Sequence, residues 1–549
     1  MRMPTVLPLP PLPPLPPLPP LPLMPLLIPL IPPMPSMPPL PSLPSMDLTR
    51  PMQPARARIP AVRARIPAVR VGIPAVRARI PAVRVGLPAV RACLAAVAAA
   101  TLAGCASLPT IVPDMARPRG PAPRIDSAQG PLSAARSQAI LARLRSRSPD
   151  TSIFERHLAL EEAIVGSPLS AGNAVQLLQD GPATYAAMLA AIAAARDHIN
   201  METYILEDDA VGQQFADALM AKQAQGVRVN LLHDSVGTFN TPAAFFERLT
   251  ASGIQVLEFN PINPLQSRKQ WLLNQRDHRK LLIIDGRIAF LGGINISSVY
   301  SGGSFGRAAA RRASPGIPAE PAWRDTDLML QGPVVADLQK LFVEHWAQQQ
   351  GPPLSEPGYF PPPVVAGQQV VRAIGSSPLD PFSHIYVTLL SAIASAETSV
   401  YLTNAYFAPD PQLLRALCDA ARRGVDVRLI LPGRTDSALI FHVGRGYYTE
   451  LLQAGVKIYE RHDAILHAKT ALIDGVWATV GSTNLDWRSF LHNHELNAVV
   501  LGPEFGAQVQ AMFNRDQAAS NPVLAEQWAQ RGLGLRVKEQ LARWWAYWL

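Results

Sequence analysis

The chain has 549 residues, 48% of them hydrophobic, so it is too long for one small domain and can bury more than one core. Its formal net charge is +9, but residues 1–104 contain 11 arginines, no lysine and one acidic residue, Asp47, so this segment carries +10 and the remainder about −1. The basic character therefore gives no support for a nucleic-acid partner. The three cysteines, Cys93, Cys105 and Cys418, cannot form a Cys/His metal cluster at any usual spacing.

The first 90 residues are of low complexity. A Pro/Leu/Met run covers residues 3–44, and a seven-residue repeat of the type RARIPAV covers residues 56–97. Proline at this density removes backbone donors, and a proline in nearly every unit excludes a coiled coil despite the heptad length. We expect residues 1–90 to be a disordered leader. Two origins stay open: a genuine proline-rich spacer, or an over-extended reading frame or expanded repeat.

Residues 91–105 have the layout of an export signal. Arg91 precedes an apolar stretch over residues 93–102, which is too short to span a bilayer, and the segment ends in Leu-Ala-Gly-Cys at Cys105. This ending resembles the lipobox of bacterial lipoproteins, which implies lipidation of Cys105. We expect a periplasm-facing lipoprotein of the cell envelope, with the outer membrane favoured because Ala106 gives no inner-membrane retention signal, and a tether over residues 106–150.

After the tether, the sequence contains an internal repeat: one pattern of helices and strands occurs twice. TYAAMLAAIAAARDHINMETYILED, from residue 184, corresponds to IYVTLLSAIASAETSVYLTNAYFAPD, from residue 385, and each is a helix pattern followed by a strand pattern. Alternating helices and strands predict an α/β fold of two α/β/α repeats packed about a pseudo-twofold axis. We place the first domain at 151–352, the second at 353–530 and an aromatic tail at 531–549.

Each repeat contains one His-x-Lys strand that leads into an Asp-Gly hairpin. His and Lys at i and i+2 point to the same face of a strand, and Asp-Gly between two apolar runs is a strong hairpin signal. A Gly-(Gly/Ser)-x-Asn segment follows in both copies. The matching residues are His278, Lys280, Asp285, Gly292, Gly293 and Asn295 in the first copy, and His467, Lys469, Asp474, Gly481, Ser482 and Asn484 in the second.

This inventory suits phosphoryl transfer at one shared pocket. One neutral imidazole can attack phosphorus, and the other can protonate the leaving oxygen and later deprotonate the acceptor. Ammonium and amide groups can hold the non-bridging oxygens, so we expect neither a metal nor a cofactor. The expected phosphate-binding residues are Lys280, Asn295, Lys469, Ser482 and Asn484.

A nucleophilic imidazole needs a carboxylate to fix its tautomer. Alignment of the Gly-Pro pairs that end WRDTDLMLQGP and NHELNAVVLGP sets Asp325 opposite Glu495, and we predict these as the histidine-orienting acids, with Asp327 as a weaker substitute for Asp325. Asp285 and Asp474 belong to the catalytic motif, but their position before the turn glycine favours a structural role in the hairpin.

The two motifs match the signature His-x-Lys-x4-Asp-x6-Gly-(Gly/Ser)-x-Asn of the phospholipase D superfamily at every position. The resemblance covers residues 173–519 and is greatest to bacterial cardiolipin synthases. It implies two phospholipase D-like domains and transfer of a phosphatidyl group to phosphatidylglycerol through a phosphohistidine. It also implies that His278 is the nucleophile and His467 the acid/base, although the symmetric sequence leaves the reverse assignment open.

The chain departs from this family in three places. A lipoprotein-like signal replaces N-terminal membrane helices, an insertion occupies residues 301–321, and Asn493-His494-Glu495 stands where Asn-Phe-Glu is common. These differences affect the expected substrate more than the reaction. A hydrolytic phospholipase D, a less favoured nuclease, and an inactive phosphate-binding lipoprotein therefore remain alternatives. We expect a phospholipid substrate and a membrane surface as partners, no nucleic acid and no obligate protein partner.

Overall fold

The computed structural model describes residues 123–148, 151–263, 272, 274–304, 322–354 and 357–549, all within one compact unit, Pro88–Leu549. The leader at 1–90, the signal segment with Cys105, and most of the insertion at 301–321 lie outside the described residues.

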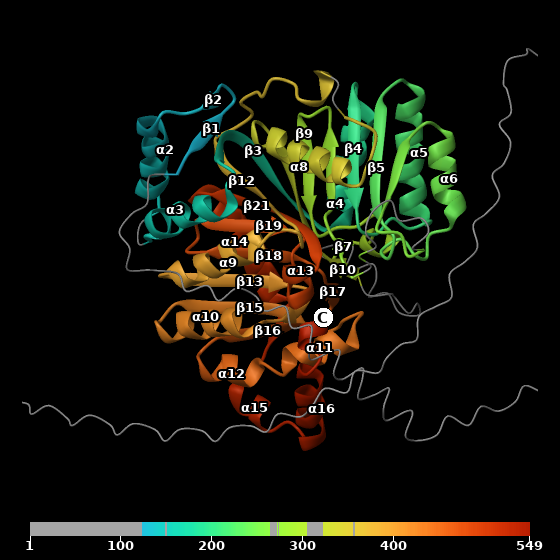
Figure 1. Cartoon of the computed structure of the whole chain (residues 1–549). Coiled ribbons are helices and arrows are strands. Elements are labelled where there is room, and N and C mark those ends of the chain that lie inside the picture. The colour runs from blue at the N-terminus through green and yellow to red at the C-terminus, as the bar shows by residue number, and fades with distance from the viewer. Residues whose placement is uncertain (1–122, 149–150, 264–271, 273, 305–321, 355–356) are drawn as a thin grey trace, which may run out of the picture. The chain divides into compact units, whose positions relative to one another are not determined.

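The first repeat is a mixed sheet with helices on both faces (Figure 1). Leu282 and Ile284 pack with the helices of one face, whereas Leu281 and Ile283 join the cluster of the opposite helix, as the twofold alternation of a strand requires. The strands are β3 (Leu169–Gln179), β4 (His198–Thr203), β5 (Arg228–Asp234), β6 (Gln255–Phe259), β7 (Arg276–Asp277), β8 (Leu281–Ile284), β9 (Ile288–Gly292), β10 (Ala322–Arg324) and β11 (Thr326–Gln331). The helices are α4 (Asp180–Ala194), α5 (Ala210–Ala224), α6 (Ala243–Ala251), η2 (Ser298–Tyr300) and α8 (Val334–Gln348), and η3 (Pro357–Tyr359) follows.

The second repeat has the same order of elements. Its strands are β12 (Gln369–Ser376), β13 (Ser399–Asn404), β14 (Phe407–Ala408), β15 (Asp426–Pro432), β16 (Lys457–Arg461), β17 (Ala464–Leu466), β18 (Lys469–Ile473), β19 (Trp477–Gly481), β20 (Leu485–Asp486), β21 (Asn493–Leu501) and β22 (Ser520–Pro522). Its helices are α9 (His384–Ser395), α10 (Pro411–Arg422), α11 (Ala438–Arg445), α12 (Tyr448–Gln453), α13 (Trp487–Leu491), α14 (Pro503–Ala518) and α15 (Ala525–Ala529).

Antiparallel pairing of β3 with β12 joins the two sheets into one. The hydrogen-bonded order is β6-β5-β4-β8-β9-β11-β3-β12-β21-β19-β18-β13-β15-β16, which reads the same from either end when the repeats are exchanged. An antiparallel central pair is what a twofold relation between neighbouring strands produces. Apolar side chains of α8 and α14, including Phe342 and Phe505, share one buried cluster between the halves. The predicted pseudo-twofold α/β architecture is therefore confirmed.

Both Asp-Gly turns have the backbone that the sequence predicts. Asp285 and Gly286 have φ of 53° and 61°, and Asp474 and Gly475 have φ of 50° and 68°. Two successive positive φ angles define the type I′ hairpin turn, whose twist matches that of the strands it joins.

Residues 125–146, which we expected within the tether, fold against the body instead. β1 (Ile125–Ser127), β2 (Gly130–Pro131) and α2 (Ala134–Ser146) lie here, and β1 pairs in parallel with β3. Ile125 is fully buried, and apolar residues of α2 pack against the core of the second half. The next helix, α3 (Ile153–Val165), packs on that core too, with His157 edge-on to Trp477 at 5.4 Å.

The aromatic tail at 531–549 is helical. α16 (Leu533–Arg543) and η4 (Ala546–Trp548) form the end of the chain and lie against α11 and α13 (Figure 1). Among the helices of the described ranges, none combines the length and apolar character that crossing a bilayer requires.

Candidate active site

A short strand pair across the halves positions His278. β7 runs parallel to the start of β21, with Asp277 opposite His494, and the backbone N–H of His278 donates to the carbonyl of His494 at 3.0 Å. The next residue of each strand therefore lies side by side, and these are His278 and Glu495. Nδ1 of His278 lies 3.0 and 3.1 Å from the two carboxylate oxygens of Glu495.

The equivalent pair positions His467. β10 runs parallel to β17, with Arg324 opposite Leu466, and the backbone N–H of His467 donates to the carbonyl of Arg324 at 2.8 Å. Asp325 follows Arg324, and its Oδ2 lies 2.7 Å from Nδ1 of His467. Each half thus supplies the acid for the histidine of the other half. Both acids contact Nδ1, which leaves Nε2 of each ring for chemistry.

Electrostatics keep His278 neutral and its acid ionised. The pKa of His278 is lowered to about 4, mainly by burial. The negative charge of Glu495 raises this pKa, and the positive charges of Lys280 and Lys469 lower it. Although burial raises it, the pKa of Glu495 falls to about 2 because of His278, Lys280 and the hydroxyl of Ser482. At neutral pH the ring can donate Nδ1–H to the carboxylate and offer a lone pair on Nε2, as a nucleophile requires.

The two lysines lie in the same buried pocket. Lys280 Nζ donates to the carbonyl of its neighbour His278 at 2.7 Å, and Lys469 Nζ lies 2.9 Å from Nδ1 of His467. Burial and then repulsion from Lys469 lower the pKa of Lys280 to about 7, and burial lowers the pKa of Lys469 to about 8 against the attraction of Asp325. An incoming phosphate would relieve this repulsion, so the two buried lysines favour anion binding.

Three expected phosphate ligands differ in their surroundings. The Asn295 amide donates to the Tyr300 hydroxyl at 3.0 Å, and this hydroxyl lies 3.2 Å from Nδ1 of His467. Ser482 donates to Oε2 of Glu495, so it fixes the acid instead of facing an anion. Asn484 is 4% exposed, and its Oδ1 has no hydrogen-bond partner in the described part of the chain. This oxygen is an acceptor and cannot bind a phosphate oxygen, so the phosphate-binding role of Asn484 stays a prediction.

Ser482 and Gly293 are at equivalent positions of the two motifs, and each lies against the acid of its own half. Gly293 lies against Asp325, and Ser482 lies against Glu495. A Cβ added at Gly293 would lie 2.2 Å from Oδ1 of Asp325, so only glycine allows this acid to approach so closely. In the second half the same position carries a hydroxyl that bonds to Glu495. Gly293 and Ser482 are therefore parts of the acid–histidine system.

Asp285 and Asp474 do not reach the histidines. Asp285 accepts backbone N–H groups of residues 196, 197 and 198, and Asp474 accepts those of residues 397, 398 and 399. Both lie at the far ends of β8 and β18, where each ties the hairpin turn to the loop before β4 or β13. The geometry gives them the structural role.

Asp327 is also outside the histidine contacts. Its Oδ1 accepts the backbone N–H of Ile294 at 3.1 Å, and burial together with the charge of Asp325 raises the pKa of Asp327 to about 8. Asp327 therefore holds a proton more tightly than an ordinary aspartate, and Asp325 is the acid that contacts His467.

Four aromatic residues that the sequence motifs do not include complete the pocket. Tyr204 lies edge-on to His278, and Tyr406 lies edge-on to His467, with ring centroids 5.1 and 6.1 Å apart. Tyr300 and Trp323 contact His467 from the first half. Tyr204 is one residue after β4 and Tyr406 two residues after the equivalent strand β13, so alignment of the repeats finds this pair only with a one-residue gap.

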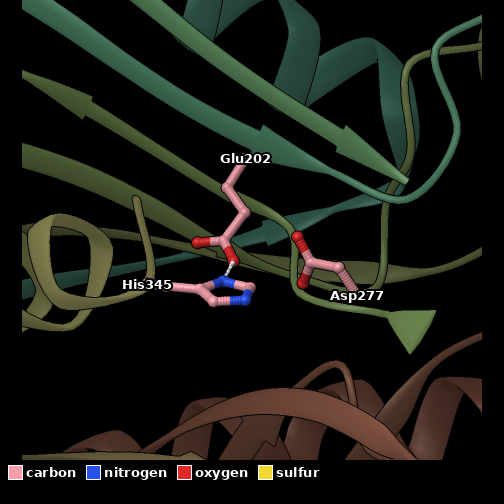
Figure 2. A group of neighbouring side chains, drawn as sticks. All are labelled: Glu202, Asp277 and His345. Atoms are coloured by element: carbon pink, nitrogen blue, oxygen red, sulfur yellow. Dashed lines mark hydrogen bonds and ion pairs between the residues drawn. The ribbon is translucent and has the colours of Figure 1, made fainter. Parts of the chain in front are cut away.

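A charged cluster lies beside β7, the strand that leads to His278. Figure 2 shows Glu202 from β4, Asp277 from β7 and His345 from α8 close together, with His345 Nδ1 2.6 Å from Oε1 of Glu202. One potential ligand atom from each lies within 4.8 Å of the others, so these residue types could approach a cation. Arg279 supplies a positive charge to the cluster, with its Nη1 3.9 Å from Oε1 of Glu202. Asp277 and His278 are adjacent in extended chain, so their side chains point to opposite faces.

The comparisons with known proteins agree with this geometry. The family described as "Cardiolipin synthase, PLD-like domain" matches residues 188–300 and 389–517, once in each half. A cardiolipin synthase from Geobacillus kaustophilus is 36% identical over 391 residues, which cover 70% of this chain and 74% of the relative. Cardiolipin synthase A from Pseudomonas putida is 35% identical over 365 residues, covering 65% of this chain and 71% of the relative.

Among solved structures, phosphatidylserine synthase from Haemophilus influenzae Rd KW20 has the same fold. It superposes with a TM-score of 0.54 at 14% identity, over 70% of this chain and 96% of that one. Taken with the paired His-x-Lys motifs, these matches define the class as enzymes of the phospholipase D superfamily. Within it, the chain belongs to the cardiolipin synthase-like family.

Proposed function

We propose that the protein is a phosphatidyltransferase that joins two phosphatidylglycerol molecules into cardiolipin and releases glycerol. The observation that carries this proposal is the crossed pairing of His278 with Glu495 and of His467 with Asp325 beside two buried lysines. The named relatives, which are cardiolipin synthases, support the choice of donor and acceptor.

The first half-reaction forms a phosphohistidine. Nε2 of His278 attacks phosphorus of the donor, the bond from phosphorus to the glycerol oxygen breaks, and His467 gives its proton to that oxygen. The negative phosphate raises the pKa of His467 on binding, which favours the protonated acid that this step needs. Lys280 and Lys469 neutralise the charge that develops on the non-bridging oxygens.

The second half-reaction returns the enzyme to its starting state. His467, now neutral, takes the proton of the acceptor hydroxyl, the acceptor oxygen attacks phosphorus, and the bond from phosphorus to His278 breaks. Water in place of the alcohol gives phosphatidic acid, which is the hydrolytic alternative. Both outcomes use the same residues and no metal.

Product analysis tests the proposal. Purified protein is incubated with phosphatidylglycerol and the lipids are followed by mass spectrometry. Cardiolipin with an equal amount of glycerol supports the transferase, whereas phosphatidic acid with glycerol and without cardiolipin shows a hydrolase.

A donor with a p-nitrophenol leaving group separates the roles of the histidines, because this leaving group departs without protonation. We expect His467→Ala to release one equivalent of p-nitrophenol and to retain a covalent phosphohistidine, and His278→Ala to do neither. The opposite pattern would exchange the two roles.

We further propose that the protein is a lipoprotein anchored through Cys105 on the periplasmic side of the envelope. The support is the Leu-Ala-Gly-Cys segment after a basic residue and a short apolar stretch. Cys105→Ser should prevent labelling of the protein by a radioactive fatty acid in cells. Labelling that persists in this variant would contradict the anchor.

A further inference from the structure

The final helix of the chain presents its apolar side to solvent. Leu533, Val537, Leu541, Trp544 and Trp548 are 76%, 49%, 48%, 79% and 47% exposed. Leu533, Val537 and Leu541 are four residues apart and lie on one side of α16, Trp544 is the C-cap of this helix, and Trp548 lies in η4 directly after it. We call these five residues the α16 stripe. Amphipathic helices of soluble proteins normally turn such a stripe toward the core.

The opposite side of α16 is fixed to the body by polar contacts. Glu539 is fully buried and pairs with Arg531 at 2.9 Å and with Arg445 at 3.5 Å. Ala542 and Ala546 are buried on the same side. Ion pairs and small buried residues thus fix the orientation of α16. This orientation leaves the α16 stripe exposed to solvent.

The α16 stripe has the chemistry of a lipid–water interface. Trp544 and Trp548 of the stripe, and the exposed Trp545 between them, combine a large apolar ring with a polar N–H. Tryptophan is enriched at the level of lipid headgroups. Arg536 and Lys538 are exposed on either side of Val537. Cations beside an apolar helix face favour anionic phospholipid over a neutral surface.

The α16 stripe also ends close to the site. The backbone N–H of Arg488 donates to the carbonyl of Leu549 at 3.1 Å, and Trp487 contacts Tyr547 with ring centroids 5.4 Å apart. Trp487 begins α13, three positions after Asn484 of the second motif. A membrane held by the α16 stripe would therefore lie near the pocket.

We propose that the α16 stripe, with Arg536 and Lys538, docks the enzyme on the surface of an anionic phospholipid bilayer. The choice of a lipid partner rests on the proposed function, while the surface itself rests on exposure, spacing and charge. A second copy of the chain is the competing occupant, but α16 has only 11 residues, which is short for a helix pair that must hold two molecules together.

The test uses the full chain with Cys105→Ser, which removes any acyl anchor. The stripe variant is Leu541→Ser/Trp544→Ser/Trp548→Ser, and the matched control is Val364→Ser/Leu379→Ser, whose residues are 55% and 65% exposed elsewhere on the chain. In flotation with phosphatidylcholine vesicles containing phosphatidylglycerol, the stripe variant should partition roughly tenfold or more weakly, because three apolar side chains no longer enter the interface. The control should bind as the parent does.

The charged residues are tested separately. Arg536→Glu/Lys538→Glu should remove the preference for vesicles with phosphatidylglycerol over pure phosphatidylcholine, together with its dependence on salt. Unchanged binding of the stripe variant, or a dimer in sedimentation that the stripe substitutions dissociate without any vesicle binding, would overturn the proposal.

Activity distinguishes this inference from the proposed function. The stripe variant should lose turnover of phosphatidylglycerol in vesicles and keep turnover of a short-chain phosphatidylglycerol dissolved as monomers. If the parent turns over neither lipid yet binds vesicles through the α16 stripe, the proposed function fails and the docking surface stands. Equal turnover of vesicle lipid by the parent and the stripe variant would contradict the docking surface alone.

Discussion

Nδ1 of His278 lies 3.0 Å from Oε1 of Glu495, although 217 positions separate the two residues in the chain. Asp325 makes the reciprocal contact with His467 at 2.7 Å. The crossing follows from the two parallel strand pairs, β7 with β21 and β10 with β17. Neither half therefore contains a complete acid–histidine pair, and this makes the roles of the acids separable by experiment.

Glu495→Gln should slow formation of the covalent intermediate. The amide can no longer hold His278 in the tautomer that exposes Nε2, so we expect kcat to fall by roughly 10²- to 10⁴-fold. The p-nitrophenol burst measures this step directly. Asp325→Asn is the matched variant: it should keep the burst with this leaving group and lose the subsequent turnover. An undiminished burst in Glu495→Gln would contradict the assignment.

The pH dependence of kcat/KM should be bell-shaped. His278 must be neutral to attack, and its pKa is about 4, so activity should rise as pH increases through this value. His467 must be protonated to give its proton in the first half-reaction, and burial and then Lys469 lower its pKa, so activity should begin to decline below neutral pH. Lys280 and Lys469 must also be protonated, with pKa values of about 7 and 8, so the decline should continue as pH rises through neutrality. Initial rates with a soluble donor measure the profile. Activity that keeps rising to pH values near the ordinary lysine pKa would be inconsistent with these ammonium roles.

Asp285→Asn and Asp474→Asn should reduce stability and leave the chemistry intact. Each carboxylate accepts several backbone N–H groups at a turn, and loss of these charge-assisted bonds should lower the free energy of unfolding by roughly 1–3 kcal/mol. Urea unfolding measures the loss, and kcat at saturating substrate should stay near that of the parent. Asp217→Asn, at an exposed ion pair with Arg248, is the control and should change neither. A stable but inactive Asp285→Asn protein would restore its catalytic role.

Gly293→Ala should damage the His467 system through Asp325. The added methyl would lie 2.2 Å from Oδ1 of this acid, so either the acid or the strand must move. We expect a loss of stability of roughly 2 kcal/mol or more and a large fall in kcat. Gly532→Ala, where an added Cβ meets nothing within 4 Å, controls for the substitution itself. Wild-type activity in Gly293→Ala would show that the contact is unimportant.

The sequence predicted the parts of the site that depend on local pattern and on duplication. His278 and Lys280 share a strand face because they are two residues apart, and Asp285-Gly286 forms a hairpin because only such residues adopt two positive φ angles readily. The acids were found because Glu495 and Asp325 occupy equivalent places in the two repeats. These inferences need no knowledge of how the halves pack.

The remainder depends on long-range register. Which acid meets which histidine is set by strand pairs between distant segments, and nothing local distinguishes the crossed from the direct arrangement. The hydroxyl of Ser482 donates to Glu495, and the amide of Asn295 donates to Tyr300. Tertiary packing sets these partners, so the motif alone does not predict them. Residues 125–146 resemble a linker by composition, yet Ile125 is part of a core most of whose members come from the second half.

The pairing of β3 with β12 has a consequence for turnover. Rotation of one half away from the other would break the hydrogen bonds between β3 and β12 and expose the apolar cluster that the halves share. The free energy that this requires is too large for a step in every catalytic cycle. Departure of the first alcohol and arrival of the second must then rely on loops and side chains around an immobile frame. Variants that stiffen the loops should slow product exchange, whereas a disulfide clamped across the central ladder should not.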